Sequence, residues 1–161
     1  MRSDLHKELQ SIGRKYALNK TYWVAEEVPT TCGVCDVWGI SRSLDYATIA
    51  IEVKVSKQDY RSQSQKDKER YTVNNPMGNT NYVLCPSGLI RSEEIHELWG
   101  LLWWNGERIV NKKPAQFVAC DDKHKLMTLI NFLNNGNNTH KPILDILYVT
   151  EIEERQSSGD P

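Results

Sequence analysis

The chain has 161 residues, which suits one domain and is too short for two comfortable ones. Hydrophobic residues make up 39% and charged residues 25% of it, which argues against a disordered chain and against a small domain that needs disulfide staples. The net charge of −1 at pH 7 neither favours nor excludes a polyanionic partner.

Hydrophobic periodicity predicts that the first half of the chain is one helix followed by three strands. An amphipathic helix is expected over residues 3–18, with Ser3 as its cap, because apolar side chains recur at helical spacing. Aromatic and β-branched residues predict strands at residues 20–28, about 34–41 and 46–55. Pro29 should end the first strand, because it has no N–H for a ladder.

The second half begins with a polar, basic helix, expected from the capping box at Ser56 to about Thr72. The other expected elements are a loop at 74–81, a strand at Tyr82–Cys85, a hairpin pairing Leu101–Trp104 with Glu107–Val110 across Asn105-Gly106, a helix at about Asp122–Asn134 closed by Gly136, and a candidate strand at Ile143–Thr150. The order predicts an α/β fold in one domain over residues 1–154, with a disordered tail at 155–161.

The strand at 46–55 has an unusual polar face. Glu52 and Lys54 alternate with apolar residues and point the same way, on a strand that otherwise looks buried. Buried charges cost several kcal/mol unless they are paired or bound to a metal. Asp36 lies on the preceding strand, so strand pairing should place it beside Glu52. The opposing interpretation is an exposed sheet face on which Glu52 and Lys54 serve solubility.

Two carboxylates beside a lysine have a definite chemistry. Hard oxygen ligands suit Mg²⁺, and Lys54 could orient or deprotonate an attacking water, which predicts metal-assisted phosphodiester hydrolysis. The segment 54–70 holds six basic and three acidic residues, a local charge of +3. Lys57, Arg61 and Lys66 are therefore candidate nucleic-acid contacts, although this helix face could simply be solvated.

Asp36 followed by Glu52-Val53-Lys54 at the end of an apolar strand resembles the PD-(D/E)XK nuclease superfamily. Within it the chain is most similar to the MmcB-like DNA-repair proteins, from about residue 20 to residue 115. The resembling segments are Glu27-Val28, Cys35–Val37, Ile51–Ser56, Asp59-Tyr60, Tyr82–Pro86, Ser87–Ile90 and Trp99–Leu102.

The resemblance implies a restriction-endonuclease-like core, with a central mixed sheet flanked by helices. It implies a DNA endonuclease of repair or recombination that depends on Mg²⁺ or Mn²⁺. Its metal ligands would be Asp36, Glu52, the carbonyl of Val53 and Glu27, with Lys54 as the catalytic lysine. Glu26 and Glu8 are alternatives for the additional acid.

The chain departs from these relatives at two positions, where Val34 and Gln63 replace a basic and an acidic residue. Neither position is a metal ligand, so the departures bear on substrate recognition rather than on chemistry. The alternatives are a catalytically silent nucleic-acid-binding module of the same fold, or a zinc-stabilised interaction domain. Whether the substrate is DNA or RNA, and whether the chain forms a homodimer, is left open.

The cysteines and histidines give weaker signals. Cys32-x-x-Cys35 could be half of a zinc site completed by Cys85, Cys120 or a histidine, but buried thiols are the favoured interpretation. The histidines share no ligand spacing and are expected at the surface: His6, His96, His124 and His140. No apolar run approaches the ~20 residues of a membrane span, so a cytoplasmic protein is expected.

Overall fold

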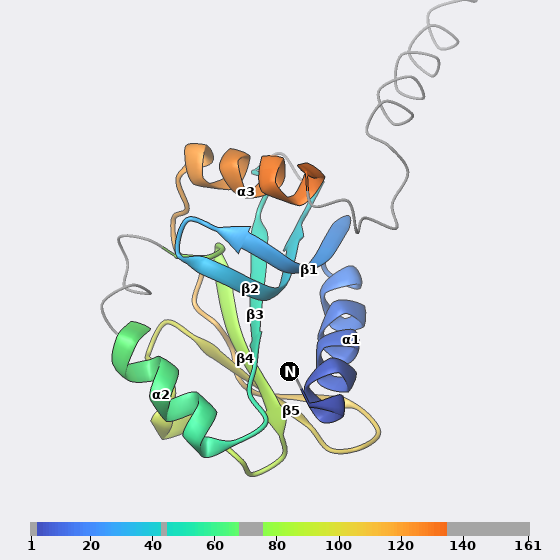
Figure 1. Cartoon of the computed structure of the whole chain (residues 1–161), viewed down its shortest axis with the longest axis vertical. Coiled ribbons are helices and arrows are strands. Elements are labelled where there is room, and N and C mark those ends of the chain that lie inside the picture. Colours follow the sequence, from blue (N-terminus) through green and yellow to red (C-terminus); the bar gives the residue numbers. More distant parts are fainter. Residues whose placement is uncertain (1–2, 43–44, 68–75, 135–161) are drawn as a thin grey trace, which may run out of the picture.

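Six strands form one mixed sheet whose spatial order follows the chain order. They are β1 (Trp23–Thr30), β2 (Gly33–Ile40), β3 (Thr48–Val53), β4 (Thr80–Pro86), β5 (Gly100–Trp104) and β6 (Ile109–Lys113). β3, β4 and β5 run parallel to one another, while the other neighbouring pairs are antiparallel. The helices are α1 (Asp4–Leu18), α2 (Lys57–Asp67) and α3 (Asp122–Asn134), with a 3₁₀ turn η1 (Ser92–Glu94). The predicted α/β class, a mixed sheet flanked by helices, is confirmed (Figure 1).

The computed structural model describes residues 3–42, 45–67 and 76–134, and the side chains of 63–67 are outside the description. The end of the predicted basic helix, Gly136, the candidate strand at Ile143–Thr150 and the tail at 155–161 therefore lie outside the described residues. Within the described ranges, no helix is both long enough and apolar enough to cross a membrane.

Helix α1 covers one face of the sheet. Ser3 caps it by accepting a hydrogen bond from the His6 amide at 3.2 Å, as its sequence predicts. Its buried side, including Leu9, packs with Ile51 and Leu84 in one apolar cluster. Gly13 lets the helix come close, because an added Cβ would lie 3.1 Å from a methyl group of Leu84.

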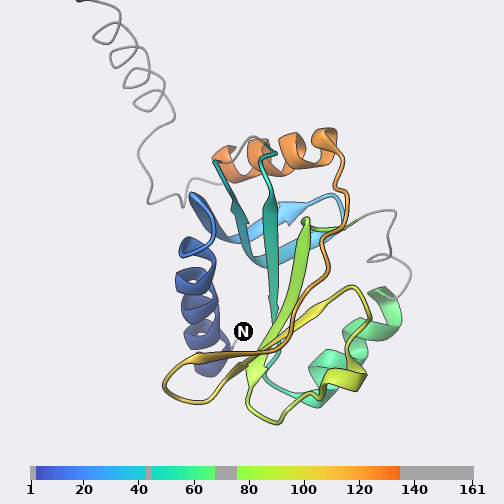
Figure 2. The same cartoon turned by 180° about the vertical axis from the view of Figure 1, so that it is seen from behind.

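Helices α2 and α3 cover the opposite face, as the two views show (Figures 1 and 2). Phe132 of α3 and Tyr60 of α2 join the cluster built on Trp38 and Leu101. The Tyr60 hydroxyl also donates to the Glu94 carbonyl at 2.6 Å, which holds α2 against η1. Because the sheet has helices on both faces, its central strands are buried on both sides.

The predicted ends of the first strand and of the hairpin turn are wrong, and the strand expected at 46–55 is the shorter Thr48–Val53. Pro29 lies inside β1 rather than ending it, which an edge strand allows because the missing N–H faces no neighbour. The hairpin connection is the four residues 105–108 rather than Asn105-Gly106 alone, with Trp104 paired to Ile109. The Asn105 side chain accepts from the amides of Glu107 and Arg108 at 3.0 and 2.9 Å, which fixes this longer turn.

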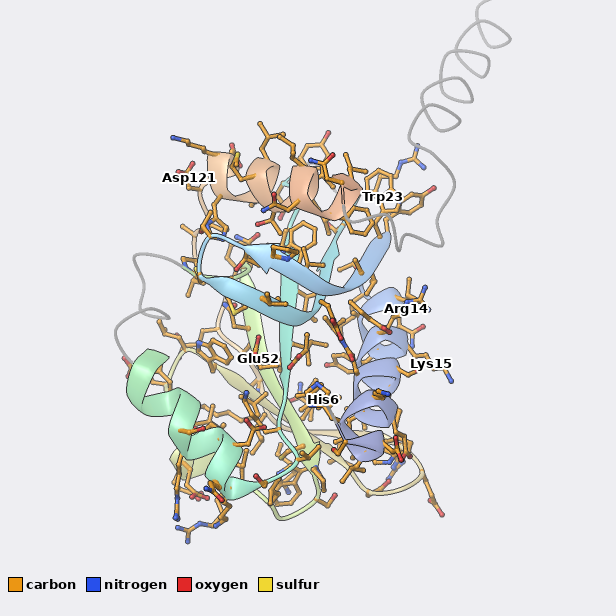
Figure 3. The ribbon with its side chains drawn as sticks, in the orientation of Figure 1. His6, Arg14, Lys15, Trp23, Glu52 and Asp121 are labelled. Carbon is orange, nitrogen blue, oxygen red and sulfur yellow. The ribbon has the colours of Figure 1, made fainter. Side chains whose placement is uncertain are left out.

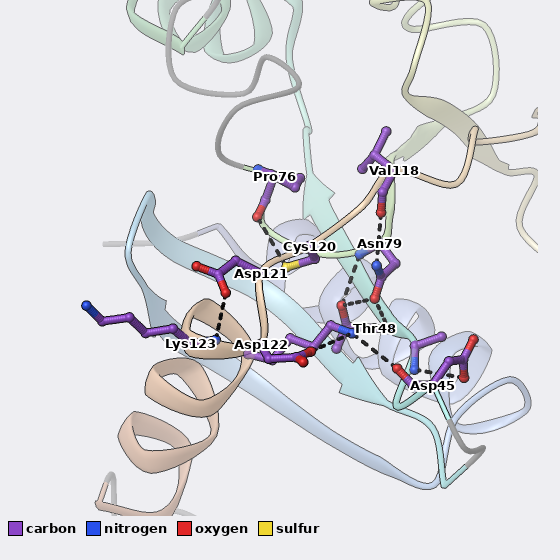
Figure 4. A network of polar contacts seen from close by, with 11 residues as sticks. Asp45, Thr48, Pro76, Asn79, Val118, Cys120, Asp121, Asp122 and Lys123 are labelled. Carbon is purple, nitrogen blue, oxygen red and sulfur yellow. Dashed lines mark hydrogen bonds and ion pairs between the residues drawn. The ribbon is translucent and has the colours of Figure 1, made fainter.

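Asn79 fixes the beginning of β4 and makes the predicted loop shorter than expected. Its carboxamide oxygen accepts from the Thr48 amide at 2.9 Å and from the Thr48 hydroxyl at 3.1 Å (Figure 4). Its carboxamide nitrogen donates to the Val118 carbonyl at 2.9 Å. One buried side chain thus joins the start of β3, the start of β4 and the segment before α3.

We expect Asn79→Ala to lower the free energy of unfolding by about 2–3 kcal/mol, because the buried Thr48 amide and Val118 carbonyl lose their partner. Urea denaturation followed by circular dichroism measures the change. Asn111→Ala, on the exposed part of β6, is the matched control and should shift stability by less than ~0.5 kcal/mol. Equal effects in the two variants would show that the Asn79 network is not a stabilising element.

Candidate functional site

The site begins where β2 and β3 move apart. Their pairing runs from Ile40–Thr48 to Val37–Ile51 and goes no further. Beyond it, the Asp36 carboxylate takes the place of a strand partner, because its Oδ2 accepts the Val53 amide at 2.8 Å. The sequence predicted Asp36 beside Glu52, and this contact places Asp36 against the residue that follows Glu52.

Helix α1 reaches Asp36 from the other side. The Gln10 carboxamide donates to the Asp36 carbonyl at 2.9 Å, and both residues are buried. One helical turn earlier, the Nε2 atom of His6 lies 3.3 Å from Oδ1 of Asp36. That buried nitrogen makes no aligned hydrogen bond to any described residue. Residues four apart share a helix face, so α1 presents both side chains to one aspartate.

The expectation that the histidines lie at the surface is therefore wrong for His6, which is 9% exposed, and for His124, which is 8% exposed. His124 contacts the Thr31 hydroxyl at the β1–β2 turn. The sequence of α1 did contain a sign that His6 is buried. His6, Gln10 and Gly13 lie on the same helix face as the buried Leu9. Sequence alone did not show which strand residue they would meet.

Glu52 and Lys54 are buried, with 4% and 6% of their surface exposed, and Asp36 is 4% exposed. The Lys54 Nζ atom lies 3.6 Å from Oε2 of Glu52, so the two charges are paired. The interpretation of this strand face as an exposed, solubilising surface is therefore wrong. Glu52 and His6 both lie at the centre of the molecule, among β3, α1 and α2 (Figure 3).

The pKa of the Cys35 thiol reflects the negative charge near Asp36 and Glu52. Burial raises the pKa of Cys35 well above its usual value, and the nearby Glu52 and Asp36 carboxylates raise it further. The thiol donates to the Val37 carbonyl at 3.0 Å, so it is held in the gap between the separating strands. Both carboxylates therefore lie within electrostatic reach of the same buried sulfur.

Glu27 has an unusual backbone. Its φ angle is +55°, a region that side chains other than glycine rarely adopt. Between the pairs Glu26–Val37 and Val28–Cys35, the residues left facing each other are Glu27 and Asp36. A strained residue opposite a buried carboxylate is typical of functional sites.

The other candidates for the additional acid are placed elsewhere. Glu26 lies 4.0 Å from Arg14 of α1, and Glu8 is exposed on α1. Glu27 is the acid whose backbone lies opposite Asp36 on the neighbouring strand, although its side chain is exposed. Its metal-binding role, like that of the Val53 carbonyl, stays a prediction.

In the basic helix α2, one of the candidate DNA-contacting cations is already paired within the fold. Lys57 lies 3.8 Å from Glu94, whose carboxyl pKa is lowered by the Arg91 amide and, less strongly, by Lys57. The Arg61 side chain is exposed, and that of Lys66 lies outside the description. Ser56 caps the helix through the Asp59 amide at 3.1 Å, as predicted.

The donor set suits a hard divalent cation rather than zinc. All four cysteines are described and none forms a disulfide, and no three Cys, His, Asp or Glu side chains among the described residues lie close enough to hold a metal. Mg²⁺ does not need such a cage, because it is commonly held by one or two carboxylates, waters and substrate phosphates. The buried carboxylates of Asp36 and Glu52 are of the type that this pattern uses.

No protein-family model matches the chain, and no curated protein matches it. The fold is similar to a solved structure, the SPO1766 protein of unknown function from Silicibacter pomeroyi, with a TM-score of 0.64 and 13% sequence identity. The match covers 99% of this chain and 98% of that one. At this identity the likeness establishes a shared fold.

We expect Glu27→Gly to raise the free energy of unfolding by about 1 kcal/mol, because glycine adopts a positive φ without steric cost. Thermal and urea denaturation measure it. Glu26→Gly is the control, one residue away, and should lower stability by a similar amount, because glycine weakens an ordinary strand position. If both variants are destabilised alike, the backbone at Glu27 is not strained.

Proposed function

We propose that this chain is a cytoplasmic, metal-dependent deoxyribonuclease of the PD-(D/E)XK type that hydrolyses phosphodiester bonds in DNA repair or recombination. The observation that carries the proposal is that Asp36 accepts the Val53 amide where β2 leaves β3, next to the buried Glu52–Lys54 pair. Asp36 on β2, Glu52 on β3 and Lys54 directly after β3 are the residue types that this reaction needs.

Asp36 and Glu52 would hold the cation together with waters and a phosphate oxygen of the substrate. When bound, a divalent metal supplies Lewis-acid stabilisation of the phosphate and lowers the pKa of bound water. Lys54 orients the attacking water and offsets negative charge that develops on the phosphate. The water oxygen bonds to phosphorus, the ester P–O bond breaks, and the leaving oxygen takes a proton, which yields a phosphate monoester and a hydroxyl.

One observation favours the alternative of a silent nucleic-acid-binding module. Asp36, Glu52 and Lys54 are at most 6% exposed, and the side chains of α1 lie against Asp36. A phosphodiester reaches them only after local opening. The two functions separate cleanly, because a silent module shifts DNA in a gel under all conditions and never cuts it.

The proposal is tested by incubating the protein with labelled single-stranded, duplex, branched and damaged DNA, and RNA, each with Mg²⁺, Mn²⁺ or EDTA. We expect cleavage of DNA with either metal and none with EDTA. Lys54→Ala should abolish cleavage while leaving metal binding largely intact, because its role is toward water and phosphate. Wild-type turnover by Lys54→Ala would remove the lysine from the mechanism.

Metal binding should also be visible without cleavage. A ligand at ~100 times its dissociation constant stabilises the native state by about 2.7 kcal/mol, which is roughly 5–10 °C in Tm for a domain of this size. We expect this shift for the wild type with Mn²⁺ and a much smaller one for Asp36→Asn. Differential scanning fluorimetry measures both, with Asp4→Asn, at the exposed start of α1, as the control. Equal shifts in all three proteins would place the metal elsewhere.

A further inference from the structure

A cluster of rings and cations, in which Tyr22 is exposed and Trp23 is half-buried, lies away from the site, where α1 connects to β1. The Arg42 guanidinium sits 5.2 Å from the centre of the Tyr22 ring, and Tyr22 contacts Trp23 edge to face with ring centres 5.0 Å apart. Tyr22 is 47% exposed, and Arg42 is exposed at the end of β2. Close by in the chain, the Lys20 ammonium lies 5.0 Å from the Tyr16 ring.

The segment of chain that carries Tyr22 and Trp23 is also basic. Residues 9–25 contain Arg14, Lys15 and Lys20 and no acidic residue. The next acid, Glu26, lies 4.0 Å from Arg14 and so offsets one of these charges. Lys15 and Lys20 therefore leave a local positive charge beside these rings, which favours contact with a polyanion.

We propose that Tyr22, Trp23 and Arg42, with Lys20, form a docking surface for single-stranded DNA that enters or leaves the site. This inference rests on the proposed function and names the form of its substrate. An exposed aromatic ring with a guanidinium on it offers a plane for an unpaired base and a charge for its phosphate. A duplex keeps its bases stacked inside, so a surface ring of this kind adds little to duplex binding.

The position of the surface relative to the site supports one continuous path. His6 stands near the start of α1 and Lys20 just beyond its end, fourteen positions apart. At ~1.5 Å per residue this is about 21 Å, the length of roughly six stacked nucleotides. Arg14 and Lys15 project from the outer side of α1, away from His6 (Figure 3), so they add positive charge to the surface along the helix.

The test is fluorescence anisotropy of labelled single-stranded and blunt duplex DNA in EDTA, where binding is read without cleavage. Tyr22→Ala should weaken single-strand binding about tenfold, leave its salt dependence unchanged, and leave duplex binding unchanged. Arg42→Ala should weaken single-strand binding and reduce the slope of log K against log salt by about 0.7, one phosphate contact. Tyr22→Phe, which keeps the ring, should bind like the wild type.

The matched controls are Phe117→Ala, which removes an exposed ring elsewhere, and Lys123→Ala, which removes an exposed charge on α3. If the wild type binds DNA but Tyr22→Ala and Arg42→Ala behave like these controls, the docking surface is wrong and the nuclease proposal stands. Equal losses for single strand and duplex in Tyr22→Ala would also overturn the single-strand assignment. A wild type that binds neither form would overturn both proposals.

Discussion

The separation of β2 from β3 is the constraint on which the candidate site depends. After the Val37–Ile51 pair the two strands no longer share hydrogen bonds, and the Asp36 carboxylate accepts the Val53 amide instead. A buried amide without a partner would cost about 1–3 kcal/mol, so this one contact keeps the gap open at little cost. The gap leaves the Asp36 carboxylate against the residue that follows Glu52, a place that continuous strand pairing would have filled.

Helix α1 ties that gap to the stability of the whole fold. Its apolar residues, with Leu9 fully buried, cover one face of the sheet. On the same side, Gln10 holds the Asp36 backbone and His6 faces its carboxylate. A substitution that moves α1 would therefore shift Asp36 as well as loosen the core. A variant of this helix can be interpreted only when its unfolding free energy and its metal affinity are measured together.

Hydrophobic periodicity and secondary-structure propensity predicted the elements, their order and the strand that leads to Glu52 and Lys54. Both signals are local, because alternation and helical spacing are read from neighbouring residues. The capping residues Ser3 and Ser56 were equally readable. The partners of Asp36 were not, since His6 and Gln10 meet it only through tertiary packing. The positive φ of Glu27 left no trace in the sequence, because nothing about glutamate suggests that conformation. The prediction that Pro29 ends its strand is wrong because the effect of a proline depends on whether the strand has an outer neighbour.

Three features that local rules disfavour occur together around Asp36: a glutamate with positive φ at Glu27, buried charges at Glu52 and Lys54, and a buried imidazole nitrogen at His6 that makes no aligned bond to a described residue. Each alone has an ordinary structural explanation. Together they are hard to explain as scaffolding, because apolar residues of similar volume commonly stabilise a core as well as a buried ion pair does, or better. Residues that violate local structural preferences tend to cluster at functional sites, where some stability is lost in exchange for chemistry. Their gathering at the strand gap, and not the sequence motif alone, is the physical argument that this place has a function.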